Sequence, residues 1–339
     1  MKRAIITAIL CLLLAACDRQ EATAPTDVDT DPLGRLSIDA SRITLSGLSS
    51  GGFMASQLHL AHSRVFSGVG VIAAGPWWCA RGDVTRALSL CTKGGDFELD
   101  SAVANARALA DAGAIDPLSH LDGDMVWLFS GGADTAVASD VVDAGGVFYG
   151  GLERATGLAV QLDTVPAAHG IPTVDQGAEC GEFVSPYINA CGYDVAGEML
   201  KVLYDSPDVE ASGDGSGAVA PVAVPGAKAA SLLEDASVYV PPQCAAGDSC
   251  GIHVSLHGCQ QSSEVVGDAY IQQAGFNRWA DALDLIIVYP QVKASSLAPM
   301  NPLGCWDWWG YTDAEYLAQS APQIAALKAT LDQLAGSEL

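Results

Sequence analysis

The sequence predicts an α/β fold in which helices flank a mainly parallel β-sheet. Apolar runs of strand length alternate with longer segments of helical periodicity, an alternation typical of repeated strand–helix units. Half of the 339 residues are hydrophobic, which suffices for the core of one large domain. We therefore expect a single α/β domain over residues 41–339.

The elements of this domain follow from the period and length of each apolar segment. Short apolar runs predict strands at 43–46, 68–74, 125–129, 158–162, 238–240, 252–256 and 285–289. Longer segments with apolar residues at helical spacing predict helices at 51–62, 101–112, 271–283 and 318–334. Residues 211–230 are rich in Gly, Ala, Pro and Val without a clear period, so we expect a loop there.

The charge of the chain restricts its partners. Lys and Arg number 16 against 40 Asp and Glu, which gives a formal net charge of -24. A surface of this sign repels phosphate backbones and anionic lipid surfaces. We therefore expect no nucleic-acid partner, and we draw no catalytic conclusion from the charge.

The N-terminus predicts export. Lys2 and Arg3 precede an uncharged apolar stretch, so residues 1–16 are expected to be a signal peptide, too short to span a membrane comfortably. The stretch ends in Leu-Ala-Ala-Cys, which resembles the bacterial lipoprotein processing motif and predicts a lipid on Cys17. Residues 17–40 would then be a flexible tether, and the membrane would be a partner only through this anchor. The alternative is an ordinary signal peptide cut nearby and a secreted protein.

Export explains the cysteines. Besides Cys11 and Cys17, eight remain: Cys79, Cys91, Cys180, Cys191, Cys244, Cys250, Cys259 and Cys305. An even number in an exported chain predicts disulfides. Proximity in sequence suggests the pairs 79–91, 180–191 and 244–250, which leaves 259–305, although the spacing does not fix the pairing. No C-x-x-C pair occurs, so we expect no metal site.

The segment Gly47-Leu48-Ser49-Ser50-Gly51 fits the pattern G-x-S-x-G between a predicted strand and a predicted helix. In that pattern the glycines allow a strained strand-to-helix turn, and the serine is exposed at its tip as a nucleophile. The alternative is a turn in which Ser49 or Ser50 caps the helix.

A nucleophilic serine needs a base, and the base needs an acid that orients it. In α/β-hydrolases the chain order is serine, acid, histidine. Asp134 follows the predicted strand 125–129 on a Gly-rich loop, and His169 follows 158–162 in a loop of small residues and prolines. Asp134 could instead hold a turn. His257 is the competing base, and the remaining histidines are expected at the surface or in packing: His59, His62, His120 and His253.

The apolar strand that ends in His257-Gly258 is typical of the loop that supplies a backbone N–H to an oxyanion hole. In that loop the histidine positions the chain. In most α/β-hydrolases this strand precedes the nucleophile, whereas here it follows Ser49, Asp134 and His169. This order is either a coincidence or a circular permutation, and we interpret it as a circular permutation of the α/β-hydrolase fold.

Several segments together carry a family resemblance. The chain resembles single-domain, circularly permuted polyhydroxybutyrate (PHB) depolymerases from about residue 41 onward. The matching segments are "SGLSSGGFMASQL", "SGGADTAV", "AHGIPT", "YVPPQC", "VSLHGCQQS", "NRWADALDLIIVYPQ" and "NPLGCWDWWGY".

The resemblance implies an esterase that cleaves poly(3-hydroxybutyrate) or its oligomers without a cofactor. It implies Ser49 as nucleophile, Asp134 as acid and His169 as base. It further implies an oxyanion hole made by the backbone N–H groups of Ser50 and Cys259. The aromatic residues implied to line the polyester crevice are Trp306, Trp308 and Trp309.

Two other functions remain open from the sequence. A feruloyl or acetyl carbohydrate esterase would use the same triad with a different crevice. A non-catalytic surface lipoprotein that binds a polymer would have no need of the triad. Alternation along an extended segment would place Trp306 and Trp308 on one side and Trp309 on the other.

Overall fold

A computed structural model describes residues 33–34, 36–156, 158–211 and 213–339. They belong to one compact unit, Pro32–Leu339. The expected signal peptide, the lipid site Cys17 and most of the expected tether lie outside the described residues. The tether was expected to reach residue 40, but the first strand begins at Ser37.

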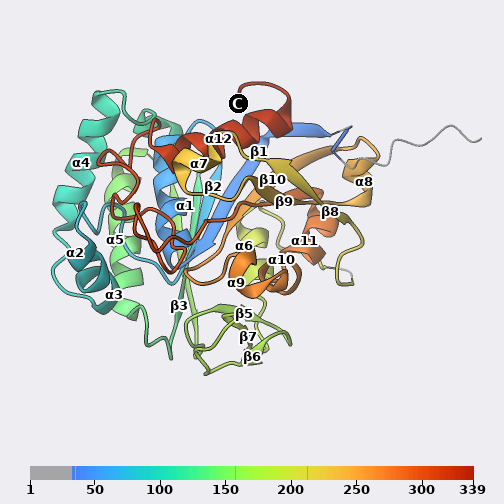
Figure 1. The fold of residues 1–339 in the computed structure, drawn as a ribbon, viewed down its shortest axis with the longest axis horizontal. Coiled ribbons are helices and arrows are strands. Elements are labelled where there is room, and N and C mark those ends of the chain that lie inside the picture. Colours follow the sequence, from blue (N-terminus) through green and yellow to red (C-terminus); the bar gives the residue numbers. More distant parts are fainter. Residues whose placement is uncertain (1–32, 35, 157, 212) are drawn as a thin grey trace, which may run out of the picture. The chain divides into compact units, whose positions relative to one another are not determined.

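The central sheet of the described part of the chain has eight strands in the order β4-β3-β2-β1-β10-β11-β9-β8 (Figure 1). Their bounds are β1 (Ser37–Leu48), β2 (Gly68–Ile72), β3 (Met125–Gly131), β4 (Ala159–Val165), β8 (Ala218–Ala223), β9 (Asp235–Val240), β10 (Ser249–Leu256) and β11 (Leu285–Tyr289). Neighbours from β4 to β11 are parallel, while β9 runs antiparallel to both β11 and β8. The prediction of a mainly parallel sheet is confirmed.

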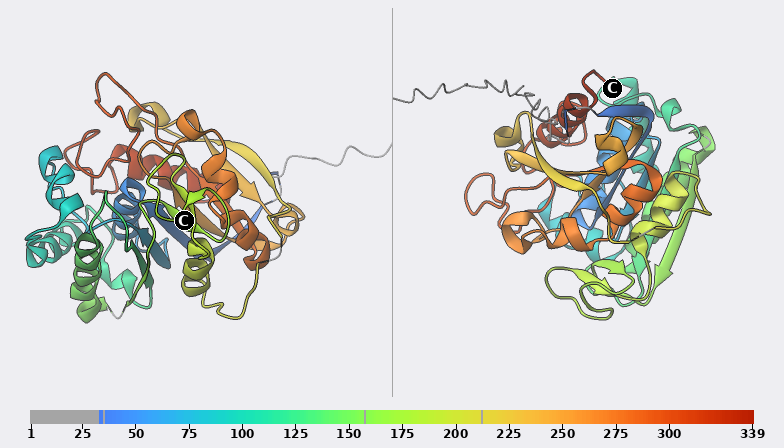
Figure 2. Two further views of the ribbon diagram at one scale, coloured as in Figure 1. Left: turned by 90° about the horizontal axis from the view of Figure 1, so that it is seen from below. Right: turned by 90° about the vertical axis from the view of Figure 1, so that its right-hand side faces the viewer.

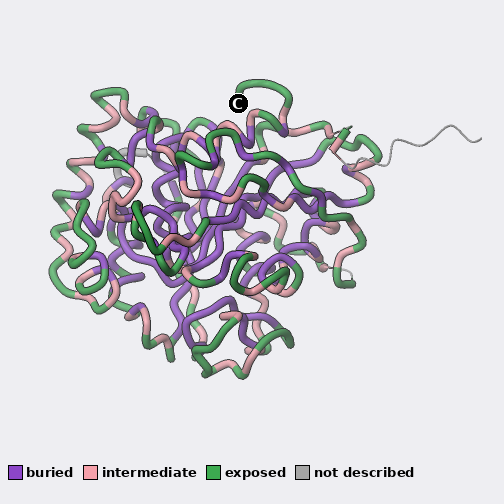
Figure 3. The backbone as a smooth tube through the Cα atoms, in the orientation of Figure 1, coloured by how far each residue is buried: buried purple, intermediate pink, exposed green. Residues whose placement is uncertain are grey.

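Helices cover both faces of this sheet (Figure 2). One hydrophobic core joins the sheet to α1 (Ser50–Ala61), α4 (Leu99–Asp111), α5 (Ser139–Thr156) and α12 (Pro322–Ala335). A second core joins it to α6 (Val195–Leu203), α10 (Ala269–Gln273) and α11 (Phe276–Leu283). Buried backbone follows the central strands (Figure 3). No helix within the described ranges is long and apolar enough to cross a membrane.

Short elements complete the connections. They are α2 (Val84–Leu88), α3 (Leu90–Lys93), the 3-10 helix η1 (Leu118–Leu121), α7 (Ala227–Ala230), α8 (Pro242–Ala245) and α9 (Ser263–Val266). A small sheet lies beyond the end of β3 and has the order β5-β7-β6, with β5 (Ile171–Thr173), β6 (Ala178–Glu179) and β7 (Ile188–Ala190).

Three sequence expectations need correction. The expected loop 211–230 contains β8 and α7. The expected helix 271–283 is two helices, because Gly275 adopts a left-handed conformation (φ 90°) between them. The helix α5 was not expected, since its four glycines lower helix propensity. One of them, Gly151, packs so closely on α4 that an added Cβ would lie 2.9 Å from Val103.

The pairing of β1 with β10 positions the site. Gly47 lies opposite Leu256, so both chains leave the sheet at the same edge. Ser49 follows β1 directly, and His257, Gly258 and Cys259 follow β10. The turn expected to hold the nucleophile and the loop expected to form the oxyanion hole are therefore neighbours.

Candidate active site

Ser49 stands at a strained turn between β1 and α1, with φ 56° and ψ -119°. A Cβ added to Gly47 would lie 2.2 Å from the carbonyl carbon of Gly51, and one added to Gly51 would lie 2.4 Å from the carbonyl oxygen of Leu256. Only glycine fits at either position, as a tight nucleophile turn requires. The Ser49 side chain makes no capping hydrogen bond to α1. The turn geometry therefore favours a nucleophile over a helix cap.

Asp134 and His169 form a buried pair. The imidazole Nδ1–H of His169 donates to Asp134 Oδ2 across 2.7 Å, and the carboxylate side chain is only 1% exposed. The other oxygen, Oδ1, accepts from the backbone N–H groups of Ala136 (2.7 Å) and Val137 (2.8 Å). Asp134 thus holds its own turn and also fixes the imidazole, which leaves Nε2 of His169 available to accept a proton.

Backbone hydrogen bonds bring these residues to one edge of the sheet. The N–H of Ser49 donates to Ile72 at the end of β2 (2.8 Å). The loop that carries Asp134 is joined to the segment before His169, since the N–H of Ala133 donates to Ala167 (3.0 Å). Within the described ranges, neither the Ser49 hydroxyl nor His169 Nε2 has a hydrogen-bond partner.

His257 anchors the loop after β10, which the sequence predicts to form the oxyanion hole. Its Nδ1–H donates to the carbonyl of Gly258 (2.6 Å), while Nε2 accepts from the N–H of Val292 (3.1 Å). Burial lowers the pKa of His257 to about 4, so the ring is neutral at pH 7. Both ring nitrogens are occupied, which argues against His257 as the base.

Two backbone N–H groups are candidates for the oxyanion hole. Ser50 is the first residue of α1, and Cys259 lies in the loop after β10. Among the described residues, neither N–H has an acceptor. Unpaired donors at a helix start and on a rigid loop suit the stabilisation of a developing negative oxygen.

The described residues contain four disulfides, with the pairings that sequence proximity suggested. These are Cys79–Cys91, Cys180–Cys191, Cys244–Cys250 and Cys259–Cys305. The last one ties the oxyanion loop to the Trp-rich segment. The second closes the small sheet that follows His169.

The Trp-rich segment differs from the expectation that all three indoles line a crevice. Trp306 is 0% exposed, and its indole N–H donates to the carbonyl of His257 (2.9 Å). Trp308 is also buried and stacks on Phe53, with ring centroids 4.1 Å apart. Both indoles are therefore core residues. Trp306 contacts the loop after β10, and Trp308 contacts α1. Of the three indoles, only Trp309 is partly exposed, and its ring meets that of Trp308 edge to face at 5.5 Å.

Sequence reasoning missed an aromatic neighbour of the base. Phe183 meets the His169 ring edge to face at 5.4 Å and is 46% exposed. It lies in the segment closed by Cys180–Cys191, which has no helical or strand period. On the side of the oxyanion loop, the carbonyl of the exposed Leu303 accepts from the N–H of Gln260 (2.7 Å). Exposed apolar residues thus contact both His169 and the loop after β10.

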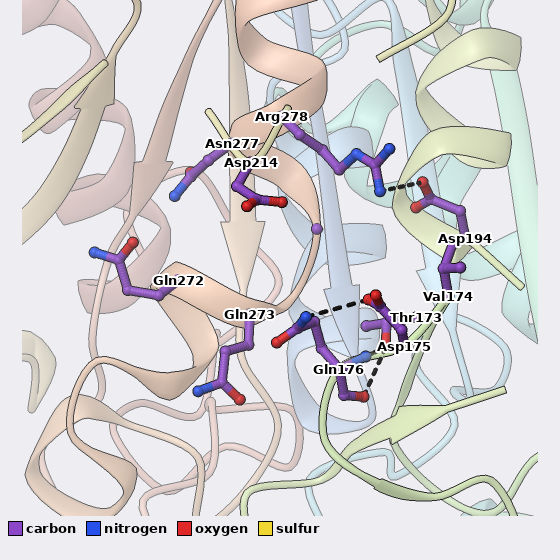
Figure 4. A pocket seen from close by; sticks show the side chains of 11 residues that line it. Thr173, Val174, Asp175, Gln176, Asp194, Asp214, Gln272, Gln273, Asn277 and Arg278 are labelled. Carbon is purple, nitrogen blue, oxygen red and sulfur yellow. Dashed lines mark hydrogen bonds and ion pairs between the residues drawn. The ribbon is translucent and has the colours of Figure 1, made fainter. Parts of the chain in front are cut away.

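A polar cavity of about 240 Å³ lies elsewhere, between the loop after β5 and the helices α10 and α11 (Figure 4). Its side chains are mostly amides and carboxylates, and Arg278 approaches Asp194 at 4.0 Å. None of the three candidate triad residues, Ser49, Asp134 and His169, lines this cavity. This cavity offers little apolar surface and is not the candidate ester site.

Comparisons with known proteins identify relatives of this chain, although no family model matches it. The sequence is 37% identical over 317 residues to poly(3-hydroxybutyrate) depolymerase of Delftia acidovorans. The aligned region covers 89% of this chain but only 61% of that relative. The sequence is 33% identical over 327 residues to polyhydroxybutyrate depolymerase of Talaromyces funiculosus, with 92% and 95% covered.

Two solved structures are similar to this fold. PHB depolymerase from Penicillium funiculosum superposes with a TM-score of 0.80, and a PHB depolymerase variant complexed with an R3HB trimer with 0.81. Each is 32% identical and covers 90% of this chain and 98% of its own. The resemblance seen in the sequence is confirmed: this chain belongs to the PHB depolymerase family.

Proposed function

We propose that this chain is a serine carboxylic ester hydrolase that cleaves poly(3-hydroxybutyrate) or its oligomers through an acyl-enzyme. The observation that carries the proposal is the strained Ser49 turn at the sheet edge that also holds the His169–Asp134 pair. Membership of the PHB depolymerase family and the R3HB trimer bound by a similar structure support the substrate class.

In the first half-reaction His169 Nε2 removes the proton from the Ser49 hydroxyl as Oγ attacks the ester carbonyl carbon. Asp134 keeps the proton of His169 on Nδ1 and stabilises the imidazolium that forms. The oxyanion accepts hydrogen bonds from the N–H groups of Ser50 and Cys259. Each such donor contributes on the order of 3 kcal/mol to transition-state stability.

Collapse of the tetrahedral intermediate breaks the ester C–O bond. His169 returns the proton to the departing alkoxide, which leaves as the hydroxyl end of the next chain segment. Water then attacks the acyl-enzyme with His169 again as base. This step releases a carboxylic acid and restores the Ser49 hydroxyl, so each turnover consumes one water and cleaves one ester bond.

The surroundings of the base and the oxyanion loop suit an apolar ester. Phe183 and Leu303 are 46% and 47% exposed, and Trp309 adds a partly exposed indole. A polyester chain presents methyl groups and carbonyls at regular spacing, which such side chains can contact. Burial of apolar area contributes ~25 cal/mol per Å².

Product analysis on competing substrates tests the substrate class. We would incubate the protein with amorphous polyhydroxybutyrate, with 3-hydroxybutyrate oligomers, and with feruloyl and acetyl sugars, and use Ser49→Ala as the blank. The proposal expects 3-hydroxybutyrate or its short oligomers as products. Faster turnover of feruloyl or acetyl sugars would assign a carbohydrate esterase instead. An absence of any serine-dependent turnover would leave a binding protein.

We further propose that the protein is exported and held at a membrane by a lipid on Cys17. The support is the charged start, the apolar stretch and the Leu-Ala-Ala-Cys end of residues 1–17. Fractionation of cells that express wild type and Cys17→Ser tests this. The wild type should sediment with membranes and the variant should be released. A wild type that is soluble, with its N-terminus elsewhere, would contradict the lipid anchor.

A further inference from the structure

Gln261 is a fully buried amide that joins the oxyanion loop to the segment that carries the base. Its side chain is 0% exposed and makes three hydrogen bonds, one through Oε1 and two through Nε2. The two ends of this one amide contact different parts of the proposed site.

The Oε1 end holds the oxyanion loop. It accepts from the N–H of Gly258 at 2.8 Å, while the carbonyl of Gly258 accepts from His257 Nδ1–H at 2.6 Å. Both polar groups of Gly258 are therefore fixed. The next N–H along the chain belongs to Cys259, and the one after it, on Gln260, is held by Leu303 at 2.7 Å. The Cys259 N–H is thus the free donor between two anchored peptides.

The Nε2 end holds the segment that carries the base. It donates to the carbonyls of Pro186 (2.9 Å) and Tyr187 (3.2 Å). The same Tyr187 carbonyl accepts from the N–H of Ile171 at 2.9 Å, two residues after His169. Tyr187 also contacts the Phe183 ring at 5.3 Å, and Phe183 packs against His169.

Position 261 requires a neutral side chain with one acceptor oxygen and one nitrogen that donates two N–H groups. A buried hydrocarbon side chain would leave the Gly258 N–H and the Pro186 carbonyl without their partner, while the Tyr187 carbonyl would keep only the N–H of Ile171. Each buried polar group left unpaired costs about 1–3 kcal/mol. A glutamate keeps the acceptor for Gly258 but directs a carboxylate oxygen at two carbonyl oxygens. An amide of this length satisfies all three groups.

We propose that Gln261 is a positioning residue that sets the distance between the Cys259 N–H and the His169 imidazole. This inference rests on the proposed function. Both groups must meet the same tetrahedral carbon, one at its oxyanion and the other at the oxygen of Ser49. A misplacement of ~1 Å costs on the order of 100-fold in rate. Loss of the bridge therefore lowers kcat more than it raises KM.

The test compares Gln261→Met and Gln261→Glu with Gln323→Met and Gln323→Glu. Gln323 is a matched control because it is 1% exposed and also makes three side-chain hydrogen bonds, to Asp307 N–H, the Ala230 carbonyl and the Tyr311 hydroxyl. None of these three hydrogen bonds reaches the loop 257–260 or the segment 169–187. We would measure kcat and KM on p-nitrophenyl butyrate together with Tm.

Gln261→Met should lower kcat roughly 10- to 100-fold with KM within about 3-fold. Gln323→Met should keep kcat of the folded fraction within about 3-fold despite a similar loss of Tm. If the two substitutions lower kcat equally, Gln261 is only a packing residue and the inference is wrong.

The pH profile of Gln261→Glu gives a second readout, which also serves if Gln261→Met does not fold. Burial raises the pKa of a glutamate, and its protonated form can donate to one of the two carbonyls. The ratio of variant to wild-type kcat should therefore rise as the pH falls from 8 to 5, whereas the ratio for Gln323→Glu should stay flat. Flat ratios for both variants would overturn the inference.

Ser49→Ala separates this inference from the proposed function. If Ser49→Ala is inactive while the Gln261 variants match their controls, only the positioning role fails. If Ser49→Ala retains wild-type activity, the serine mechanism fails and the positioning role fails with it.

Discussion

His169 Nδ1 and Asp134 Oδ2 lie 2.7 Å apart, although the two residues are 35 positions apart in the chain. A second buried His–Asp pair joins His59 of α1 to Asp124 at 3.0 Å. The two pairs are alike in chemistry and differ in place, because Asp134 follows the carboxyl end of β3 and Asp124 precedes its start. Only the first pair lies at the edge that carries Ser49.

Asp134→Asn should therefore inactivate the protein without unfolding it. The amide oxygen still accepts from Ala136 and Val137, but the new amide N–H₂ favours the wrong tautomer of His169. We expect kcat to fall about 10⁴-fold, with a small change in Tm. Asp124→Asn is the control, and it should lower Tm while kcat per folded molecule stays near wild type. The opposite pattern would move the base to another histidine.

The buried His253 should make the free energy of unfolding depend on pH. Its ring lies between Thr44 and Ser46 in the core, and burial lowers its pKa to about 3. In the unfolded chain a histidine has a pKa of ~6.5. Below that value the unfolded state binds a proton that the folded state excludes. This histidine should therefore make the free energy of unfolding fall by up to ~1.4 kcal/mol per pH unit as the pH drops from about 6.5.

Denaturant unfolding between pH 7.5 and 5 measures this slope. His253→Gln should be less stable than wild type at pH 7 but should lose less stability per pH unit. His120→Gln, at an exposed position, should keep the wild-type slope. Equal slopes for all three proteins would mean that His253 is protonated in the folded state.

The disulfide Cys259–Cys305 should support activity more than overall stability, because it joins the oxyanion loop to the segment that starts at Trp306. The double variant Cys259→Ser/Cys305→Ser should lose ~10-fold or more in kcat while its circular dichroism remains native. The double variant Cys244→Ser/Cys250→Ser, which opens a link at the other end of β10, should retain kcat. A free thiol at Cys259 in peptide mapping of the wild type would contradict this account.

The burial of the three tryptophans predicts two phenotypes. Trp309→Ala should lower activity on the polymer far more than on p-nitrophenyl butyrate, because the triad is untouched and only exposed apolar surface is lost. Trp306→Ala should destabilise the fold by about 3–5 kcal/mol and reduce both activities together. Equal losses on both substrates for Trp309→Ala would exclude this indole from the polyester site.

Periodicity predicted the central strands well, because β2, β3, β10 and β11 are buried apolar runs. Periodicity failed for α5, because its glycines lower the predicted helix propensity. It also failed for the strands of the small sheet, which have only two or three residues. The circular permutation stays an interpretation of the chain order.

The candidate triad was predictable because each member follows a strand of the sheet, so its place depends on local sequence. Gln261 and Phe183 were not predictable, since their roles depend on contacts with residues far away in the chain. Gln261 reaches a segment about 75 positions earlier, and nothing in the local pattern marks that contact. Trp306 was misassigned because burial depends on the same long-range packing.

The most direct test of the central claim is the rate at which wild type, Ser49→Ala and His169→Ala release 3-hydroxybutyrate products from amorphous polymer. Because triad members act as a unit, the rate of each single variant should be lower by about 10⁴-fold or more. The rate of the double variant Ser49→Ala/His169→Ala should be little lower still. Tm should stay near the wild-type value for all three variants. Substantial activity in Ser49→Ala, or loss of activity in His257→Ala while His169→Ala stays active, would contradict the account.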